Sequence, residues 1–340
     1  MAGHMRAWQC ASPGNTDAGL TLNDGAPRPS AASLKAGEIL VRVVSAGLNP
    51  ADYKLPQMGL AARALTSFPK TLGMDLGGQV AAVGEGVADV QTGDSVVARV
   101  DPLKAPGSLS EYVVVPRDGY APLAGDTDLD WAAGVATAGL TAYQTIKPYV
   151  RPGDRVFING GSGGTGTFGI QIAKLLGCHV TVSCSTAKAA LCKELGADQV
   201  IDYKTADVLE TLKKAGPVYS LAVDNVGTSP PYLHASSSAF LAPGAPFVVV
   251  AGAASCSYFV QVASALFRPA ILGGGKNKVV VYLTKNRRDD LSQLAQWLVQ
   301  GKLKTAVEST YEFADVPKAF AHLKKGSTAG KVVVHVAPKA

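Results

Sequence analysis

The chain has 340 residues, of which 47% are hydrophobic and 17% are charged. This composition supplies a large apolar core and argues against intrinsic disorder, and at about 100–200 residues per domain the length predicts two domains. The net charge of +6 is a small excess for this length. Because no dense basic run with interleaved aromatic residues is present, the sequence disfavours nucleic-acid binding, whereas a mild positive field suits an anionic small ligand.

Membrane and targeting signals are weak in this sequence. No apolar stretch approaches the roughly 18 residues that cross a bilayer without a polar, glycine or proline break. The five cysteines are an odd number, and none are spaced C-x-x-C, which favours a reducing compartment over a disulfide framework or a zinc ribbon. We therefore expect a cytoplasmic protein with no transmembrane segment, and association with an organelle stays open.

The first 120 residues predict a β-rich unit. Short β-branched segments bounded by Gly, Pro or Asp are typical of strands, and they lie at 38–45, 79–83, 95–100 and 111–115. Turn signals such as Gly84-Glu85-Gly86 and Thr92-Gly93-Asp94 separate them. Together these segments predict a compact, barrel-like β unit.

Strand patterns alternate with helical patterns beyond about Trp131. Predicted strands lie at 155–159, 179–183, 199–202, 220–224, 246–251 and 278–282, and predicted helices follow the first two of them at 167–176 and 186–195. Such alternation indicates βαβ units and a parallel sheet. The tail carries a predicted helix at 288–300, then a strand, a helix and a strand ending at 330–335, which suggests a return to the first domain.

The strongest motif is Gly161-Ser162-Gly163-Gly164-Thr165-Gly166, between a predicted strand and a predicted helix. Glycines at this spacing allow a tight turn and close approach of a pyrophosphate, and the helix N-terminus adds free N–H groups. An ordinary glycine-rich turn without a ligand is the alternative. The surrounding strand–turn–helix–strand order favours a dinucleotide site.

The residues after the second of these strands select the cofactor. An NAD site would carry an acidic residue about 20 residues beyond the loop, bonded to the ribose 2′-hydroxyl, but no Asp or Glu lies between Thr167 and Lys193. Ser185 and Lys188 stand there instead, and a hydroxyl with an ammonium suits a 2′-phosphate. We therefore predict NADPH; the alternative for Lys188 is a solvated lysine on a helix face.

These motifs resemble the medium-chain dehydrogenase/reductase superfamily, in its zinc-less quinone-oxidoreductase branch. The segments that carry the resemblance are Gly47–Lys54, Gly73–Gly78, Ala138–Ala142, the glycine loop, Asp202-Tyr203, Asp224–Gly227 and Gly330–Val333. The match covers almost the whole chain, and within the branch it is most similar to chloroplast-envelope quinone-oxidoreductase homologues, reticulon-interacting oxidoreductases and fungal trans-acting enoyl reductases.

The resemblance implies an α/β fold with two domains. Residues 1–124 would form a GroES-like β-barrel catalytic domain, and residues 125–284 an NADP-binding Rossmann domain with a doubly wound parallel sheet. Residues 285–340 would return to the catalytic domain.

The resemblance also implies cofactor contacts at matching positions. The 2′-phosphate would meet Ser185, Lys188 and Tyr203. The diphosphate would meet the loop residues Ser162, Gly163, Gly164, Thr165 and Gly166. Further implied contacts are Asn225, the backbone of Ala251 and Gly252 on the nicotinamide side, and Gly330 with Lys331 near the C-terminus.

Zinc-bearing alcohol dehydrogenases of the superfamily place Cys where Asn49 or Pro50 stands and His where Met74 stands. They also carry a lobe of four closely spaced cysteines that this sequence lacks. A catalytic zinc needs three N, S or O ligands and an open position, and such a set cannot be assembled here. We therefore expect no metal, and we interpret the five cysteines as small buried hydrophobic residues.

Without zinc, hydride transfer to a plain ketone lacks its usual Lewis acid. Quinones and α,β-unsaturated carbonyls accept hydride at carbon and leave charge on an oxygen, which requires hydrogen-bond donors and a proton source. Candidates are Asn49, Tyr53 and Lys54. In the enoyl-reductase relatives, a lysine at the Lys54 position and a threonine at the Thr137 position lie beside the cofactor and substrate. The alternatives are core packing for Tyr53, and a surface ion pair or a purely cofactor-binding role for Lys54.

We expect an NADPH-dependent reductase of quinones or α,β-unsaturated carbonyls, acting on a small-molecule electrophile. Two alternatives stay open: a trans-acting enoyl reductase that serves a polyketide synthase, and an NADPH-binding protein with a structural role and no turnover. The tyrosine donor of mitochondrial 2-enoyl-thioester reductases is missing from its expected stretch, Met58–Ala61, which weighs against acyl thioesters. We also expect a homodimer, paired through the apolar strand at 278–282.

Overall fold

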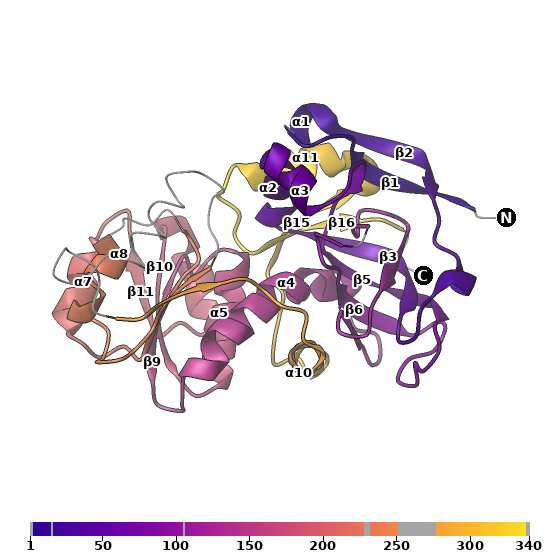
Figure 1. Cartoon of the computed structure of the whole chain (residues 1–340). Coiled ribbons are helices and arrows are strands. Elements are labelled where there is room, and N and C mark those ends of the chain that lie inside the picture. Colours follow the sequence, from indigo (N-terminus) through magenta and orange to yellow (C-terminus); the bar gives the residue numbers. More distant parts are fainter. Residues whose placement is uncertain (1–2, 15, 105, 228–231, 251–276, 338–340) are drawn as a thin grey trace. The chain divides into compact units, whose positions relative to one another are not determined.

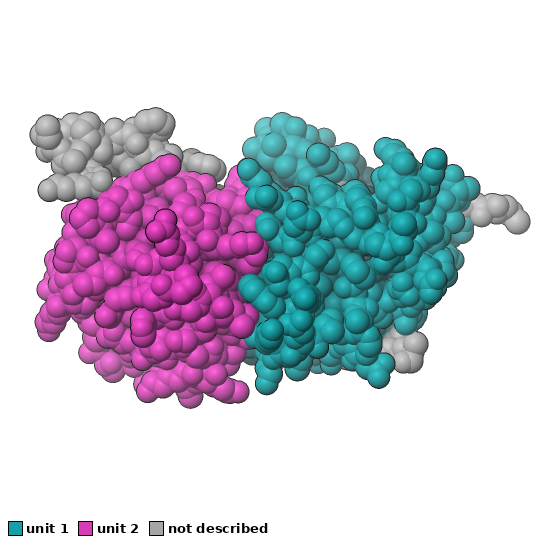
Figure 2. Space-filling view, turned by 90° about the horizontal axis from the view of Figure 1, so that it is seen from below, with its two compact units in different colours: residues 1–140, 285–340 teal, residues 141–284 magenta. Residues whose placement is uncertain are grey.

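The computed structural model describes residues 3–14, 16–104, 106–227, 232–250 and 277–337. The chain separates into two compact units, coloured in Figure 2: unit 1 comprises residues 1–140 and 285–340, and unit 2 comprises residues 141–284. The boundary between residues 140 and 141 falls inside helix α4 (Leu129–Ile146), which runs unbroken across it.

Unit 1 is built on a seven-stranded sheet with the order β15-β16-β3-β5-β6-β8, in which β7 also pairs with β3. Its strands are β3 (Ile39–Leu48), β5 (Asp75–Val83), β6 (Ser95–Arg99), β7 (Tyr112–Val115), β8 (Tyr120–Pro122), β15 (Val307–Glu312) and β16 (Lys331–His335). A smaller sheet contains β1 (His4–Cys10), β2 (Leu20–Pro27) and β4 (Lys70–Thr71). The inward-facing β-branched and leucine side chains of these strands form one buried core cluster with the apolar face of α11 (Val316–Lys324).

The other helices of unit 1 are short, apart from α4 and α10. They are α1 (Thr16–Gly19), η1 (Ala31–Ser33), α2 (Pro50–Gln57), α3 (Leu60–Leu65), α10 (Arg288–Val299) and η6 (Phe313–Asp315). In Figure 1, α2, α3 and α11 lie together beside β15 and β16. Helix α2 begins at Pro50, where proline fits because the first helical N–H has no partner within the helix.

Strand pairing brings three distant segments together at one end of the large sheet. Strand β16 pairs with β3, with Val333 opposite Gly47, and β5 pairs with the other side of β3, with Asp75 opposite Gly47. Helix α4 packs directly on this position, since a Cβ on Gly47 would lie 2.1 Å from the carbonyl oxygen of Ala133. The end of β3, the start of β5, the start of β16 and α4 therefore meet around one glycine.

Unit 2 is built on a six-stranded parallel sheet with the order β11-β10-β9-β12-β13-β14. Its strands are β9 (Arg155–Asn159), β10 (His179–Cys184), β11 (Gln199–Asp202), β12 (Leu221–Asp224), β13 (Phe247–Val250) and β14 (Val279–Tyr282). Its helices are η2 (Lys147–Tyr149), α5 (Gly164–Leu175), η3 (Thr186–Lys188), α6 (Ala189–Glu194), α7 (Val208–Ala215), α8 (Tyr232–Ala235) and η4 (Ser237–Ala239).

This strand order is that of a doubly wound dinucleotide-binding sheet. The chain starts at β9, adds β10 and β11 on one side, and then crosses to β12, β13 and β14 on the other. Ligands of such sheets bind at the carboxyl ends of the strands, at the point where the order reverses. The predicted fold class is confirmed, and the predicted glycine loop follows β9 at this switch point.

The two connections between the units are bonded to each other on the unit 2 side. The hydroxyl groups of Thr141 and Thr284, the first and last residues of unit 2, lie 2.5 Å apart. Across the described part of the chain, every helix is too short or too polar to cross a membrane.

Candidate functional site

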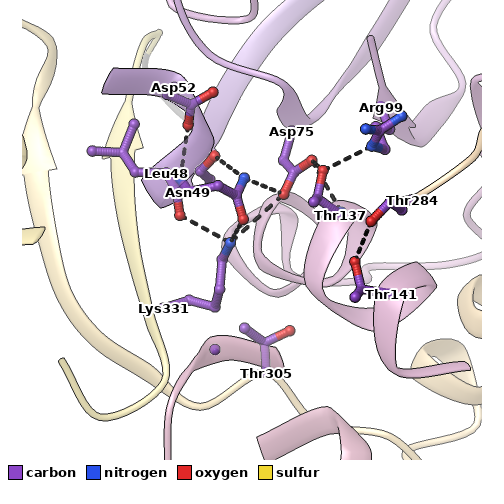
Figure 3. A network of polar contacts seen from close by, with 12 residues as sticks. Leu48, Asn49, Asp52, Asp75, Arg99, Thr137, Thr141, Thr284, Thr305 and Lys331 are labelled. Carbon is purple, nitrogen blue, oxygen red and sulfur yellow. Dashed lines mark hydrogen bonds and ion pairs between the residues drawn. The ribbon is translucent and has the colours of Figure 1, made fainter. Parts of the chain in front are cut away.

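Asp75, at the start of β5, is the centre of a buried hydrogen-bond network in unit 1 (Figure 3). Its Oδ1 accepts bonds from the backbone N–H of Thr137 at 3.0 Å and from the Thr137 hydroxyl at 2.5 Å. Its Oδ2 accepts a bond from Asn49 Nδ2 at 2.8 Å and lies 3.6 Å from Lys331 Nζ. One fully buried carboxylate therefore holds α4, the β3–α2 turn and β16 together.

Lys331 is enclosed within unit 1, with 3% of its side chain exposed. Its ammonium donates to the carbonyl oxygen of Leu48 at 2.9 Å and to Asn49 Oδ1 at 2.7 Å. Burial lowers the pKa of Lys331, and the negative charges of Asp75 and Asp52 oppose that shift. The ammonium thus fixes the turn that leads into α2.

Arg99, at the end of β6, extends the network to the second connection between the units. Its Nε donates to the Thr137 hydroxyl at 2.9 Å, and its Nη1 donates to Asn286 Oδ1 at 2.5 Å. Asn286 returns a bond to the carbonyl oxygen of Arg99 at 3.1 Å. The Thr137 hydroxyl therefore accepts a hydrogen bond from Arg99 and donates its one proton to Asp75.

Asp52, in the first turn of α2, places a second carboxyl in the same interior. Its Oδ2 accepts the backbone N–H of Asn49 at 2.7 Å. Its Oδ1 is buried and has no hydrogen-bond partner among the described residues. Desolvation and, to a smaller extent, the charge of Asp75 raise the pKa of Asp52, whereas the hydrogen bond from the Asn49 N–H and the charges of Lys331 and Arg99 lower it; the net effect is a pKa of about 7.

The two predicted catalytic residues that follow Asp52 lie in different surroundings. Tyr53 packs against the core cluster of unit 1, and the Lys324 ammonium lies 5.4 Å from the centre of its ring. Lys54 is half-buried; burial lowers its pKa, and no described carboxylate supplies a compensating charge. Neither side chain belongs to the network around Asp75, so the structure groups Asn49, Thr137 and Lys331 but not Tyr53 and Lys54.

In unit 2, the glycine loop joins β9 to α5 as predicted. Gly163 is the residue before α5, and no side chain caps the first N–H groups of the helix. The chain passes so close to itself at Gly166 that a Cβ there would lie 2.2 Å from the carbonyl oxygen of Gly160. The loop therefore leaves helix N–H groups uncapped, as a diphosphate needs, and admits no side chain at Gly166, where the helix starts close to the preceding turn.

The predicted 2′-phosphate residues meet through strand pairing. Strand β10 ends at Cys184 opposite Asp202 of β11, and the Tyr203 N–H donates to the Cys184 carbonyl at 3.1 Å. Ser185 directly follows Cys184, and the Lys188 N–H bonds back to the Ser185 carbonyl at 2.9 Å. Tyr203 is 53% exposed. A hydroxyl, a lysine and a phenol ring thus gather after the carboxyl ends of two neighbouring strands.

The remaining predicted cofactor residues are placed as follows. Asn225 directly follows β12, and its buried Oδ1 has no partner in the described structure. Gly330 precedes β16 in unit 1 and is buried. Ala251 and Gly252 lie outside the described residues.

Sequence reasoning assigned no role to Asp75, Arg99 or Asn286. Asp75 stands inside the quoted segment Gly73–Gly78, and an acidic residue in an otherwise apolar strand was the available signal. Arg99 is the charged end of a β-branched strand, and its partners lie 38 and 187 residues away in the chain. Such separations carry no local pattern.

Two family models match the chain. Residues 35–125 match the alcohol dehydrogenase GroES-like domain, and residues 195–334 match a model described as zinc-binding dehydrogenase. Trans-enoyl reductase pgmF from Aspergillus terreus is 41% identical over 344 residues, covering 98% of this chain and 96% of that protein. The human mitochondrial NAD(P)H oxidoreductase RTN4IP1 is 32% identical over 335 residues, covering 88% of this chain and 82% of that protein.

The fold is also similar to that of a solved structure. The quinone oxidoreductase from Coxiella burnetii superposes with a TM-score of 0.83 at 28% identity, covering 98% of this chain and 99% of that chain. The similarity therefore spans both units, and it includes relatives named for a quinone and for an enoyl substrate.

Proposed function

The chain belongs to the medium-chain dehydrogenase/reductase superfamily of oxidoreductases, and from this premise we propose that it is an NADPH-dependent reductase of quinones or α,β-unsaturated carbonyls that works without zinc. Members of the superfamily bind nicotinamide cofactors. The observation that carries the choice of NADPH is the grouping of Ser185, Lys188 and Tyr203 after the carboxyl ends of β10 and β11, together with the lack of Asp and Glu between Thr167 and Lys193; the nearby Asp202 is hydrogen-bonded to Thr186.

The residues present in unit 2 fit such a cofactor. The uncapped first turn of α5 suits the diphosphate, and the absence of a side chain at Gly166 lets α5 start close to the backbone of Gly160. The buried, unpartnered Oδ1 of Asn225 is an acceptor at the switch point of the sheet. Ser185 and Lys188 would bind the 2′-phosphate. The nicotinamide, when bound, supplies the hydride.

A catalytic zinc does not fit the described residues. Within the described ranges, no three His, Cys, Asp or Glu side chains come close enough together to hold a metal ion. The carboxylate that lies next to Met74, that of Asp75, already has the Lys331 ammonium 3.6 Å from one of its oxygens. The proposed reaction therefore takes its electrostatic support from side chains.

Within unit 1, the proposal gives different roles to the four predicted catalytic residues. The amide of Asn49 and the hydroxyl of Thr137 are already bonded within the Asp75 network, so we assign them to positioning the β3–α2 turn and α4. Lys54 carries an ammonium that no described carboxylate neutralises. We assign Lys54 the task of stabilising the oxygen that gains charge when hydride reaches the acceptor, with Tyr53 as a secondary donor.

The test is a panel of quinones, enones and alkenals with NADPH and NADH, with cofactor oxidation as the readout. We expect turnover with NADPH and a preference for it over NADH. A charge-assisted contact to phosphate is worth about 1.5–3 kcal/mol, or roughly 10–100-fold in affinity, so Lys188→Ala should lose that factor for NADPH and almost none for NADH. Equal binding of both cofactors by the wild type would refute the assignment, and tight binding without any turnover would indicate a binding protein.

A second candidate function is favoured by the relative at 41% identity, which is named a trans-enoyl reductase. Such an enzyme would reduce an enoyl chain carried by a polyketide synthase. The same panel distinguishes the two candidates when an enoyl chain on an acyl carrier protein is added. Activity on the carrier-bound chain together with inactivity on every free enone would favour this second function.

A further inference from the structure

Three polar side chains lie side by side in the parallel sheet of unit 2, just below the glycine loop. They are Ser183 of β10, Asn159 of β9 and Asp224 of β12, and the pairing sets Asn159 opposite both of the others. They are buried, with 1%, 6% and 6% of the residue exposed. Buried polar groups are almost always hydrogen-bonded in folded proteins, so we expect these three side chains to form hydrogen bonds with one another.

The hydrogen bonds of this row all run in one direction. The Gly160 N–H donates to Ser183 Oγ at 3.1 Å, so the single hydroxyl proton goes to Asn159 Oδ1, at 2.5 Å. Asn159 Nδ2 then donates to Asp224 Oδ1 at 2.8 Å. The partners on both sides fix the orientation of the Asn159 amide, and the row ends on the Asp224 carboxylate.

Asp224 also holds the turn that follows its own strand. Its Oδ1 accepts the N–H groups of Val226 at 3.0 Å and Gly227 at 3.4 Å. The Asn159 carbonyl accepts the N–H of Asn225 at 3.2 Å. The row therefore connects the first residue of the glycine turn, after β9, to the turn after β12. These two turns border the switch point of the sheet.

We propose that Asp224 is a positioning residue for the nicotinamide dinucleotide: through Asn159 and Ser183 it fixes the two turns between which the cofactor binds. This inference rests on the proposed function, since it requires that a dinucleotide binds there. Three donors converge on one oxygen, and an ionised carboxylate accepts them about twice as strongly as a neutral group does. The preorganisation of both turns therefore depends on the charge of Asp224.

The charge of Asp224 is sensitive to pH. Burial raises the pKa of this carboxyl, and its hydrogen bonds from Asn159 and the two backbone N–H groups oppose that shift. Within the described structure these facing groups are all uncharged. As the pH falls through the raised pKa, the carboxylate gains a proton and the turns lose their common acceptor, so cofactor affinity should fall.

The experiment measures direct binding of NADPH and of NADH from about pH 8 down to about pH 4, the ordinary pKa range of a carboxyl, for the wild type and Asp224→Asn. At the upper end of this range we expect Asp224→Asn to bind both cofactors about tenfold more weakly, which corresponds to about 1.4 kcal/mol. The wild type should lose affinity for NADH toward low pH, and Asp224→Asn should not. NADH is the decisive ligand because the 2′-phosphate of NADPH itself titrates near pH 6.

A matched control is Asp154→Asn. Asp154 also accepts a backbone N–H, from Arg151 at 2.7 Å, and a hydroxyl, from Ser220 at 3.0 Å, but it lies at the amino ends of the same strands. The Asp154→Asn variant should therefore keep the cofactor affinity of the wild type and its dependence on pH. If Asp224→Asn does not fold, Ser183→Ala replaces it, because it leaves Asp224 in place and removes only the hydroxyl that joins the Gly160 N–H to Asn159 Oδ1; it should weaken binding of both cofactors several-fold.

The outcomes separate this inference from the proposed function. If the wild type binds NADPH but Asp224→Asn, or Ser183→Ala in its place, matches the wild type in affinity and in pH profile, the positioning role of Asp224 is wrong and the proposed function stands. If Asp154→Asn weakens binding as much as Asp224→Asn does, the effect is a general loss of stability, and the inference is overturned. If the wild type binds neither cofactor, both are overturned.

Discussion

At the scale of single residues, Lys331 and Asp75 place opposite charges in the interior of unit 1, 3.6 Å apart. Removing one partner of a buried pair leaves the other charge unpaired, which costs about 3–5 kcal/mol. We therefore expect Lys331→Met to lower the free energy of unfolding, measured in urea, by that amount. Lys318→Met, which removes an exposed lysine paired with Asp315, should change it by less than about 0.5 kcal/mol. Similar small losses in both variants would contradict the role of the ammonium in balancing Asp75.

Asp52 should make stability depend on pH. Its carboxyl has a pKa of about 7 in the folded chain, raised mainly by desolvation, whereas an unfolded chain ionises it near about 3.9. Between these values the folded state holds a proton that the unfolded state has lost, so the group stabilises the fold at low pH and loses that effect as the pH rises toward 7.

Asp52→Asn should remove this dependence. The stability advantage of Asp52→Asn over the wild type should be greater at pH 8 than at pH 5, by up to about 2.7 kcal/mol, because about two pKa units lie between pH 5 and the folded pKa of about 7. Urea denaturation at both pH values measures the difference. A difference between the two proteins that stays constant over this range would mean that Asp52 is ionised throughout.

Lys54 should matter for the chemistry more than for folding. A donor to the oxygen that gains charge is typically worth about 100–1000-fold in turnover, so Lys54→Ala should lower kcat on a reactive enone at least tenfold. NADPH affinity and melting temperature should stay near those of the wild type, and Tyr53→Phe should cost less because water can replace the hydroxyl. Weaker NADPH binding with intact kcat would instead make Lys54 a cofactor ligand.

The predictability of these residues depends on where their partners lie. Asn49, Thr137 and Lys331 were named because they stand in motifs that resemble a family. Asp75 and Arg99 were not named, because their places in the hydrogen-bond network depend on strand pairings that no local sequence pattern encodes. The enclosure of Lys331 could not be predicted either, because a lysine in a short strand is indistinguishable from a surface lysine until its neighbours in space are known.

At the scale of elements, the turn from β9 to α5 gives a test with a control inside the same loop. Gly166→Ala would place a Cβ 2.2 Å from the Gly160 carbonyl oxygen, whereas a Cβ on Gly163 meets only that same oxygen, at 3.8 Å. We expect Gly166→Ala to force the helix away from the strand, lowering the melting temperature and weakening NADPH binding at least tenfold. Gly163→Ala should fold like the wild type. Equal tolerance of both substitutions would contradict the close approach at Gly166.

The elements of unit 2 were the most predictable part of the chain. Strands β9 and β11 coincide with the expected segments 155–159 and 199–202 because β-branched runs between turn residues have few alternatives. The hairpin of β1 and β2 was not predicted, since most of β2 is exposed and carries little apolar alternation. Helix α4 was missed as well, because it is apolar on nearly all sides and lacks the polar face that marks a helix in a sequence.

At the scale of the whole molecule, the return of the C-terminal segment to unit 1 depends on strand pairing between distant residues and not on any local sequence pattern. Strand β16 lies between β15, to which it is parallel, and β3, to which it is antiparallel. The tail thus completes a sheet begun about 290 residues earlier, a closure that depends on contacts between residues far apart in the chain. A strand–helix–strand tail predicts its own elements but not the sheet that it joins.

The homodimer remains a prediction about this whole chain. Among the described strands, β14 is an edge of the unit 2 sheet, and it carries Val281 at 36% exposure with Leu283, directly after it, at 69%. An exposed apolar edge favours pairing with another strand, and a lysine on it opposes pairing. Light scattering at micromolar concentration should therefore give twice the 34.9 kDa chain mass, and Val281→Lys should shift the protein to the single-chain mass. Val218→Lys, at a similarly exposed valine outside this edge, should leave the dimer intact, and a wild type that scatters as a single chain would contradict the prediction.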